Sequence, residues 1–262
     1  MRFKVVGVGL AVASLVLASG CGSAAPESFQ TGPRDLVLQM TEIPAVVDPG
    51  EPAALVPTFS LYGDGRVLIS GPDDRQGALP RVRELQLSEE RVQQLVTNAL
   101  QAGVQDNREE NIEIDPDAPT VVLTLTAEEQ FGWTELGPNV GGRLGQLRDS
   151  LLAYADREDA EGYEHDAIAV LATPAEPEAG VEEWPLAELR PSAELRIGEA
   201  LCTTYRRTSV EDATATARGA DAEQRWSSGA NVFDVRFRPM LPHEADCESL
   251  ATDHRTRAEE QN

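Results

Sequence analysis

The cysteine at position 21 is the reactive residue whose surroundings indicate its chemistry most clearly. Arg2 and Lys4 begin the chain with positive charge. Residues 5–18 are almost wholly apolar, and small residues then lead into Cys21. This is the layout of a secretory signal. A transmembrane helix is disfavoured, because the apolar run is shorter than the roughly 20 residues that a bilayer requires. We therefore expect residues 1–20 to be an export signal.

The run Leu17-Ala18-Ser19-Gly20-Cys21 resembles the processing site of bacterial lipoproteins. Ala18 departs mildly from that family, in which leucine is more typical at this position. The resemblance implies removal of residues 1–20 and a diacylglycerol group on the sulfur of Cys21. Two or more acyl chains hold a protein stably at a membrane where one does not. The expected location is the extracytoplasmic face of the cell membrane; the alternatives are an ordinary cleaved signal and a buried free thiol.

Two further cysteines, Cys202 and Cys247, would remain in the mature chain. An even pair in an oxidising compartment predicts a disulfide bond. In the chain-entropy model, closing a loop of this length stabilises the fold by about 4 kcal/mol. A redox role is disfavoured, because the sequence holds no Cys-x-x-Cys pair.

The excess of acidic over basic residues limits the kinds of partner that the chain is expected to bind. The chain has 22 basic and 45 acidic residues, and its only lysine is Lys4. Without Arg2 and Lys4 the mature chain keeps 20 basic residues, which gives a formal charge of −25. Such a charge argues against nucleic acid, whose affinity for proteins rests on neutralised phosphates. Solubility is the favoured explanation of the acidity, and sequestration of cations is the alternative.

No metal or cofactor site is predicted. The densest acidic group consists of Asp106, Glu109, Glu110, Glu113, Asp115 and Asp117. It lacks the spacing and the central glycine of an EF-hand, so we expect a solvated loop, with Ca²⁺ binding as the alternative. The three histidines, His165, His243 and His254, are too scattered for a recognisable zinc site.

No catalytic residue is predicted either. The glycine-rich segment 137–144 lies between an expected strand and an expected helix, but Arg143 and Leu144 stand where a phosphate-binding loop needs a lysine and a hydroxyl. Asp64 is interpreted as a turn former rather than an acid catalyst. The three tryptophans, Trp133, Trp184 and Trp226, are expected in the hydrophobic core, with a glycan-binding groove as the alternative.

We interpret residues 21–35 as a flexible tether and residues 36–156 as a first domain. Strands are expected over 36–41, 58–62, 66–69 and 82–87. Asp64-Gly65 predicts a hairpin with a type I′ turn, in which Leu61 faces Leu68.

A helix should follow, with Ser88 as its N-cap and Gly103 at its C-terminal end. A second hairpin is expected over 120–126 and 131–136, and apolar spacing then predicts a helix that ends near residue 155. The order of four strands, a helix, two strands and a helix indicates an α+β arrangement.

Residues 165–255 are interpreted as a smaller α+β module that the disulfide staples together. Strands are expected over 167–172, 194–197, 200–205 and 232–238, and a helix is expected to begin at a Ser209 cap. The predicted fold class is therefore α+β, with antiparallel sheets and helices packed on one face, in two small modules. A single continuous sheet is the alternative.

Short motifs along the mature chain resemble known but uncharacterised families. The run Leu61-Tyr62-Gly63-Asp64-Gly65-Arg66-Val67, the helix from Ser88 and the strand 120–126 resemble bacterial domains built around a similar glycine hairpin. The run from Arg236 to Glu244 is similar to secreted lipoproteins of high-GC Gram-positive bacteria. These resemblances imply a fold and a location and carry no activity.

The expected function is that of a lipid-anchored extracytoplasmic protein that binds another envelope protein or a cell-wall component. The anchor and the absence of catalytic patterns lead to this hypothesis. The alternative is an envelope enzyme whose site is assembled from distant residues, which would show convergent polar groups in a pocket. A solute receptor is a third hypothesis.

Overall fold

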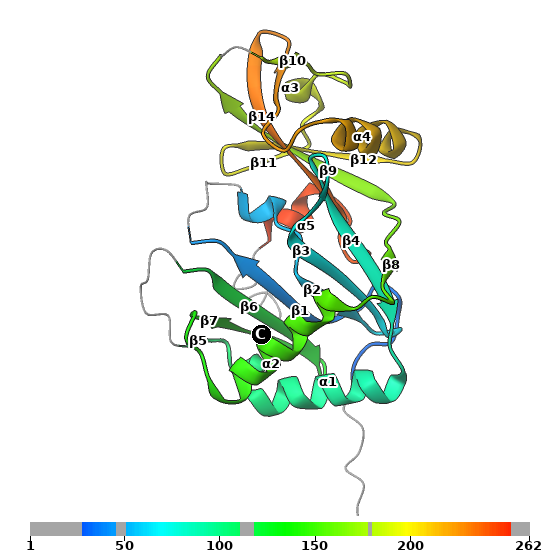
Figure 1. Cartoon of the computed structure of the whole chain (residues 1–262), viewed down its shortest axis with the longest axis vertical. Helices are drawn as coiled ribbons and strands as arrows, with labels where there is room; N and C mark the ends of the chain where they lie inside the picture. Colours follow the sequence, from blue (N-terminus) through cyan, green and yellow to red (C-terminus); the bar gives the residue numbers. More distant parts are fainter. Residues whose placement is uncertain (1–27, 46–50, 111–117, 178–179, 253–262) are drawn as a thin grey trace, which may run out of the picture.

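The computed structural model describes residues 28–45, 51–110, 118–177 and 180–252, which fold into two sheets with helices packed against them (Figure 1). The predicted signal, residues 1–20, and the predicted lipidation site Cys21 lie outside these residues. Within the described part of the chain, no helix is both long and apolar enough to span a membrane. The α+β fold class, with mainly antiparallel sheets, is confirmed.

The larger sheet has eight strands in the order β5-β7-β6-β1-β2-β3-β4-β8. Its strands are β1 (Leu36–Ile43), β2 (Phe59–Tyr62), β3 (Arg66–Gln76), β4 (Leu79–Gln86), β5 (Arg108–Glu110), β6 (Thr120–Ala127), β7 (Gln130–Leu136) and β8 (Glu161–Gly162). Only β5 and β7 pair in parallel among these strands. The sheet reaches beyond residue 156, where the sequence analysis ends the first domain.

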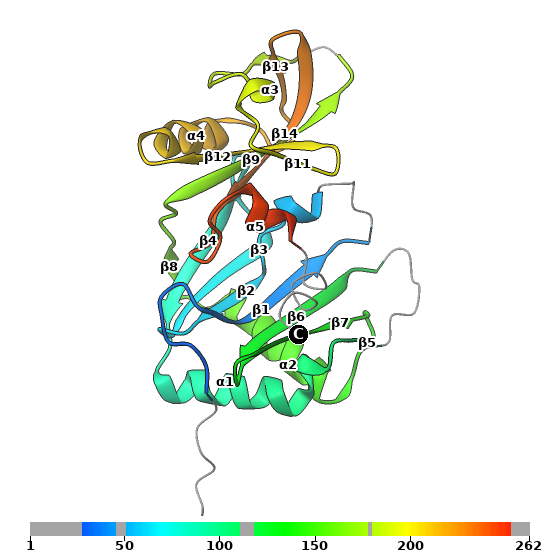
Figure 2. The same ribbon diagram turned by 180° about the vertical axis from the view of Figure 1, so that it is seen from behind.

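Two helices, α1 (Glu89–Ala102) and α2 (Gly142–Leu152), cover one face of this sheet, as predicted (Figures 1 and 2). The Ser88 side chain accepts a hydrogen bond from the amide of Arg91, and Gly103 takes a left-handed φ of 83°. Both predicted ends of α1 are therefore confirmed. Apolar side chains of the two helices form one core with alternate residues of the strands. Since strand residues alternate between faces, the remaining strand side chains point away from the helices.

The β2–β3 hairpin differs from its prediction by one residue. Leu61 pairs with Val67, not with Leu68. Only Gly65 has a positive φ, of 86°, and its amide donates to the carbonyl of Tyr62. The loop is thus three residues long, with glycine in the left-handed position, and the predicted type I′ turn is wrong. Asp64 accepts hydrogen bonds from the amide and the guanidinium of Arg66, which agrees with a turn-forming role.

A two-residue turn with positive φ at both positions occurs instead in the β6–β7 hairpin. Ala127 pairs with Gln130, and the turn between them consists of Glu128 at φ 54° and Glu129 at φ 62°. Left-handed backbone is costly for residues with a Cβ atom. The side-chain amide of Gln105 supports the turn by donating to the carbonyls of Ala127 and Gln130.

The second half of the predicted tether is attached to the larger sheet. Phe29 packs against the helix-covered core, and the carbonyl of Ser28 accepts from the amide of Glu128. Gly63 lies so close to this segment that a Cβ atom there would stand 2.0 Å from the carbonyl oxygen of Gln30. Residues 28–35 therefore belong to the folded body.

The smaller sheet has six strands in the order β10-β13-β14-β9-β12-β11. They are β9 (Ala167–Ala175), β10 (Glu182–Glu183), β11 (Leu195–Ile197), β12 (Ala200–Arg206), β13 (Arg225–Ser228) and β14 (Asn231–Pro239). Its helices are α3 (Leu189–Ser192), α4 (Thr208–Gly219) and α5 (Cys247–Ala251). Neither β10 nor β13 was predicted from the sequence. The predicted N-cap of α4, Ser209, is wrong, because Arg207 holds that position and Ser209 lies in the first turn.

The two modules are joined by the long β3–β4 hairpin, which reaches from the larger sheet to α4 (Figures 1 and 2). At its tip the amide of Ala78 donates to the carbonyl of Ala217 in α4. Ala78 and Leu79 are buried in the core of the smaller module. In the opposite direction, Leu241 of the C-terminal segment packs with Leu36 and Tyr62 of the larger module. Contacts of both modules thus cross the predicted boundary.

Candidate functional site

A groove of about 1270 Å³ runs along the face of the larger sheet that α1 and α2 leave uncovered. Its floor is made by alternate residues of three neighbouring strands, all of which point away from the helices. They are Gln39, Thr41 and Ile43 of β1, Val122, Thr124 and Thr126 of β6, and Phe131 and Glu135 of β7. Apolar and hydrogen-bonding side chains are therefore mixed across the floor.

The walls come from segments that are far apart in the sequence. One wall is the 3₁₀ helix η1 (Glu51–Ala54) with Leu55 and Pro57, and another is the end of α5 with Leu250 and Thr252. Ile197 of β11 also contributes, and it packs with Leu250 near Ala53. The groove therefore lies between the two modules, and its shape depends on how they are held together.

A buried ion pair fixes the C-terminal side of the groove. The guanidinium of Arg238, at the end of β14, donates to Glu244 at 2.5 and 2.7 Å, and the side chains are 5% and 6% exposed. Arg238 also donates to the carbonyl of Leu55 at 2.9 Å, while Glu244 accepts from the amide of Leu241 at 2.7 Å. This two-pronged pairing leaves few polar atoms of either side chain unsatisfied. One pair thus ties β14, the wall at Leu55 and the C-terminal turn together.

The charge of Glu244 depends on Arg238. Burial by itself would raise the pKa of Glu244, but the charge of Arg238 and the hydrogen bonds from it outweigh burial. The pKa of Glu244 therefore lies below its ordinary value of 4.5. The carboxylate stays ionised and paired at neutral pH.

Tyr62 and His243 form a second contact across the module boundary. The Tyr62 hydroxyl and Nδ1 of His243 are 2.9 Å apart, and their rings are 5.8 Å apart. Tyr62 is fully buried, and burial followed by the charge of Glu244 raises its pKa well above the ordinary value. The hydroxyl therefore stays protonated, and its contact with His243 is a link between the modules.

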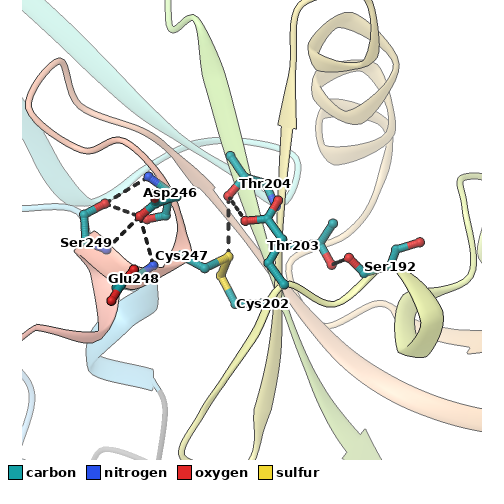
Figure 3. The surroundings of a disulfide bond; sticks show 9 residues. Ser192, Cys202, Thr203, Thr204, Asp246, Cys247, Glu248 and Ser249 are labelled. Carbon is teal, nitrogen blue, oxygen red and sulfur yellow. Dashed lines mark hydrogen bonds between the residues drawn. A yellow bond between two sulfur atoms is a disulfide. The ribbon is translucent and has the colours of Figure 1, made fainter.

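The predicted pair Cys202 and Cys247 is joined in a disulfide bond (Figure 3). Cys202 lies in β12, and Cys247 is the first residue of α5. The Asp246 side chain caps α5 by accepting hydrogen bonds from the amides of Glu248 and Ser249. The Ser249 hydroxyl in turn accepts a hydrogen bond from the amide of Asp246. The disulfide therefore holds α5 on the smaller sheet, in the position where its far end lines the groove.

The histidines and the acidic segment considered as candidate metal ligands do not come together in the described residues. His165 contacts Thr214 of α4, His243 lines the groove, and His254 lies outside the described residues. In the acidic segment, Arg108 pairs with Asp106 and Glu110, and residues 113, 115 and 117 are not described. Within the described residues, no group of three or more potential metal-ligating side chains comes together.

Two of the three tryptophans lie in the core of the smaller module, and the third lies on the groove side of the larger sheet. Trp184 and Trp226 pack edge to face at 5.3 Å in the core of the smaller module. Trp133 is also buried, but it clusters with Phe131 and lies on the same side of β7 as that groove residue. The groove itself could not be predicted from the sequence, because its residues share no motif.

Comparisons of the chain with protein-family models, with curated proteins and with solved structures found no match.

The ion pair predicts how stability depends on pH. A carboxyl group whose folded pKa is lowered stabilises the fold above its unfolded pKa and loses that contribution as the pH falls through the folded value. We expect the contribution of Glu244 to the free energy of unfolding to be complete above pH 4.5 and to be lost progressively in more acidic solution. Glu244→Gln should cost about 3–5 kcal/mol at neutral pH, because it leaves Arg238 buried without its counter-charge.

Urea unfolding followed by circular dichroism at a series of pH values measures both effects. Glu161→Gln in the exposed end strand β8 is the matched control and should change the free energy of unfolding by less than about 0.5 kcal/mol. If Glu244→Gln proved as stable as the unaltered protein at neutral pH, the pair would not contribute to the stability of the fold.

Proposed function

We propose that this protein is a lipid-anchored, extracytoplasmic binding protein that uses the groove on the larger sheet to hold a segment of an envelope protein or a cell-wall component. The single observation that carries the binding role is the groove itself. Its floor belongs to one sheet, and its C-terminal side is held by the Arg238–Glu244 pair and by the disulfide bond.

The form of the groove favours an extended ligand. Its floor crosses three strands and is lined by a mixture of polar and apolar side chains. Sites of this kind bury apolar surface of a ligand and orient it with a few hydrogen bonds. The exposed side chain of Glu129 lines one part of the groove, which favours a ligand that places positive charge there.

The location that we propose rests on the predicted membrane anchor. It rests on the signal-like segment 1–20 and on the lipoprotein-like sequence around Cys21. An acylated Cys21 would hold the folded body, which begins by Ser28, close to the membrane surface. The binding groove would then act on components within reach of that surface.

The anchor can be tested by the mass of the chain isolated from its native membrane. We expect a polypeptide that begins at Cys21 and carries acyl chains, and a Cys21→Ser variant that loses stable membrane attachment. Ser23→Ala is a matched control that should leave processing intact. A chain that still begins with Met1, or a bare thiol at Cys21, would contradict the proposal.

The binding site can be tested by placing a photoreactive amino acid at Thr41 of the anchored protein in intact cells. The same amino acid at Asn98, on the exposed side of α1, serves as the control. We expect a discrete covalent adduct of an envelope component from Thr41 and none from Asn98. Equal adducts from both sites, or none from Thr41, would exclude the groove as the binding site.

A further inference from the structure

Two hydrogen-bonding side chains of the groove floor lie opposite each other on neighbouring strands. Gln39 of β1 pairs in register with Thr124 of β6, and both line the groove. The side-chain nitrogen of Gln39 donates to the hydroxyl of Ser60 at 3.1 Å, which leaves the side-chain oxygen of Gln39 as an acceptor. Thr124 is only 8% exposed, and its hydroxyl has no hydrogen-bond partner within the described part of the chain. Since buried hydroxyls are as a rule hydrogen-bonded, a ligand in the groove can supply the missing partner.

We propose that the groove recognises the backbone amides of an extended peptide segment, which lies along β1 and β6 between Gln39 and Thr124. This inference names the ligand of the binding site proposed above and rests on that proposed function. The N–H and C=O groups of a trans peptide bond point in opposite directions within one plane. A peptide bond between the two side chains can therefore donate to Gln39 and accept from the hydroxyl of Thr124 at the same time.

The spacing of the hydroxyl groups along β6 fits a polypeptide. Thr126 follows Thr124 by two residues and also lines the groove. Two residues of an antiparallel strand span about 6.8 Å, and every second carbonyl of an extended peptide recurs on one side at that same distance. A peptide that runs along β6 can therefore accept one hydrogen bond from each threonine. An isolated amide, such as the acetamide group of an amino sugar, would contact only one of them.

The other end of the same two strands is apolar on the groove side. Val122 of β6 lies opposite Thr41 of β1, and Ile43 follows Thr41 by two residues. Val122 and Ile43 line the groove, and Leu55 and Leu250 add apolar surface from its walls. Burial of an apolar ligand side chain at this end would add to the affinity. The ligand that fits is therefore an extended peptide with an apolar residue near Ile43.

A selection with synthetic peptides tests this inference on the full-length protein. The probe is a pool of N-acetylated, C-amidated octapeptides, and the peptides that bind are identified by mass spectrometry. Each amide of a selected peptide is then replaced in turn by an ester, which removes one N–H donor and keeps the length of the chain. We expect one such ester to weaken binding about threefold to tenfold, because it removes the hydrogen bond to Gln39. Isothermal titration calorimetry measures the affinities.

A matched pair of variants tests the contribution of the threonine hydroxyl. Thr124→Val removes the hydroxyl with little change of shape and should also weaken the selected peptide about threefold to tenfold. Thr173→Val in β9 is the control, because Thr173 is a half-buried strand threonine that does not line the groove. It should leave the affinity unchanged. Thermal melting followed by circular dichroism checks that both variants fold, and the ester series on the unaltered protein remains decisive if one does not.

Three results would overturn the inference. They are a pool from which no peptide binds, a selected peptide whose affinity no ester changes, and a folded Thr124→Val variant that binds as tightly as the unaltered protein. Binding of an N-acetylglucosamine oligomer in place of the peptides would overturn it as well and would assign the groove to a glycan. In each case an adduct from the photoreactive residue at Thr41 would still support the proposed binding role, whereas the lack of that adduct would contradict the binding role itself.

Discussion

The arrangement of the molecule depends on one buried pair of opposite charges, Arg238 and Glu244. Moving two charges out of water is costly, and the cost is offset only where the geometry is good and the remaining polar atoms are satisfied. Here Arg238 makes two bonds to Glu244 and a third to the carbonyl of Leu55, and Glu244 also accepts from the amide of Leu241. The pair therefore joins the last strand of the smaller sheet to a wall of the groove and to the C-terminal turn.

The groove follows from an asymmetry in how the larger sheet is covered. Two helices bury one face, which satisfies the apolar side chains that point toward them. The other face has a mixture of hydroxyl, amide and apolar side chains, and parts of it are covered by Leu241 of the C-terminal segment and bordered by η1, β11 and α5. A sheet with one face packed on a core and one face available for contacts is common among antiparallel sheets. In this protein the face turned away from the helices is bounded on several sides, so its side chains line a groove.

Predictions from the sequence succeeded where a local signal determines local structure. The ends of α1 depend on Ser88 and Gly103, and both act within a few residues. The hairpin at Asp64-Gly65 was recognised, but its register was not, because a three-residue loop and a two-residue loop share the same glycine signal. The turn at Glu128 and Glu129 was found by its position between strands, although its residue types give no sign of its left-handed backbone.

The candidate site could not be predicted for a different reason. Thr41, Thr124 and Leu250 become neighbours of one groove only when both sheets and the C-terminal helix are in place. Their residue types are ordinary, and their spacing in the sequence carries no period. The disulfide could be predicted because only two cysteines, Cys202 and Cys247, follow the predicted lipidation site at Cys21.

The central claim is that the two modules form one unit, which gives the groove fixed walls. Differential scanning calorimetry of the protein tests it most directly, because a cooperative unit melts in one transition whose van't Hoff enthalpy equals the calorimetric enthalpy. We predict one such transition. Two separate transitions, or a calorimetric enthalpy about twice the van't Hoff value, would show that the modules unfold independently and that the groove between them has no fixed form.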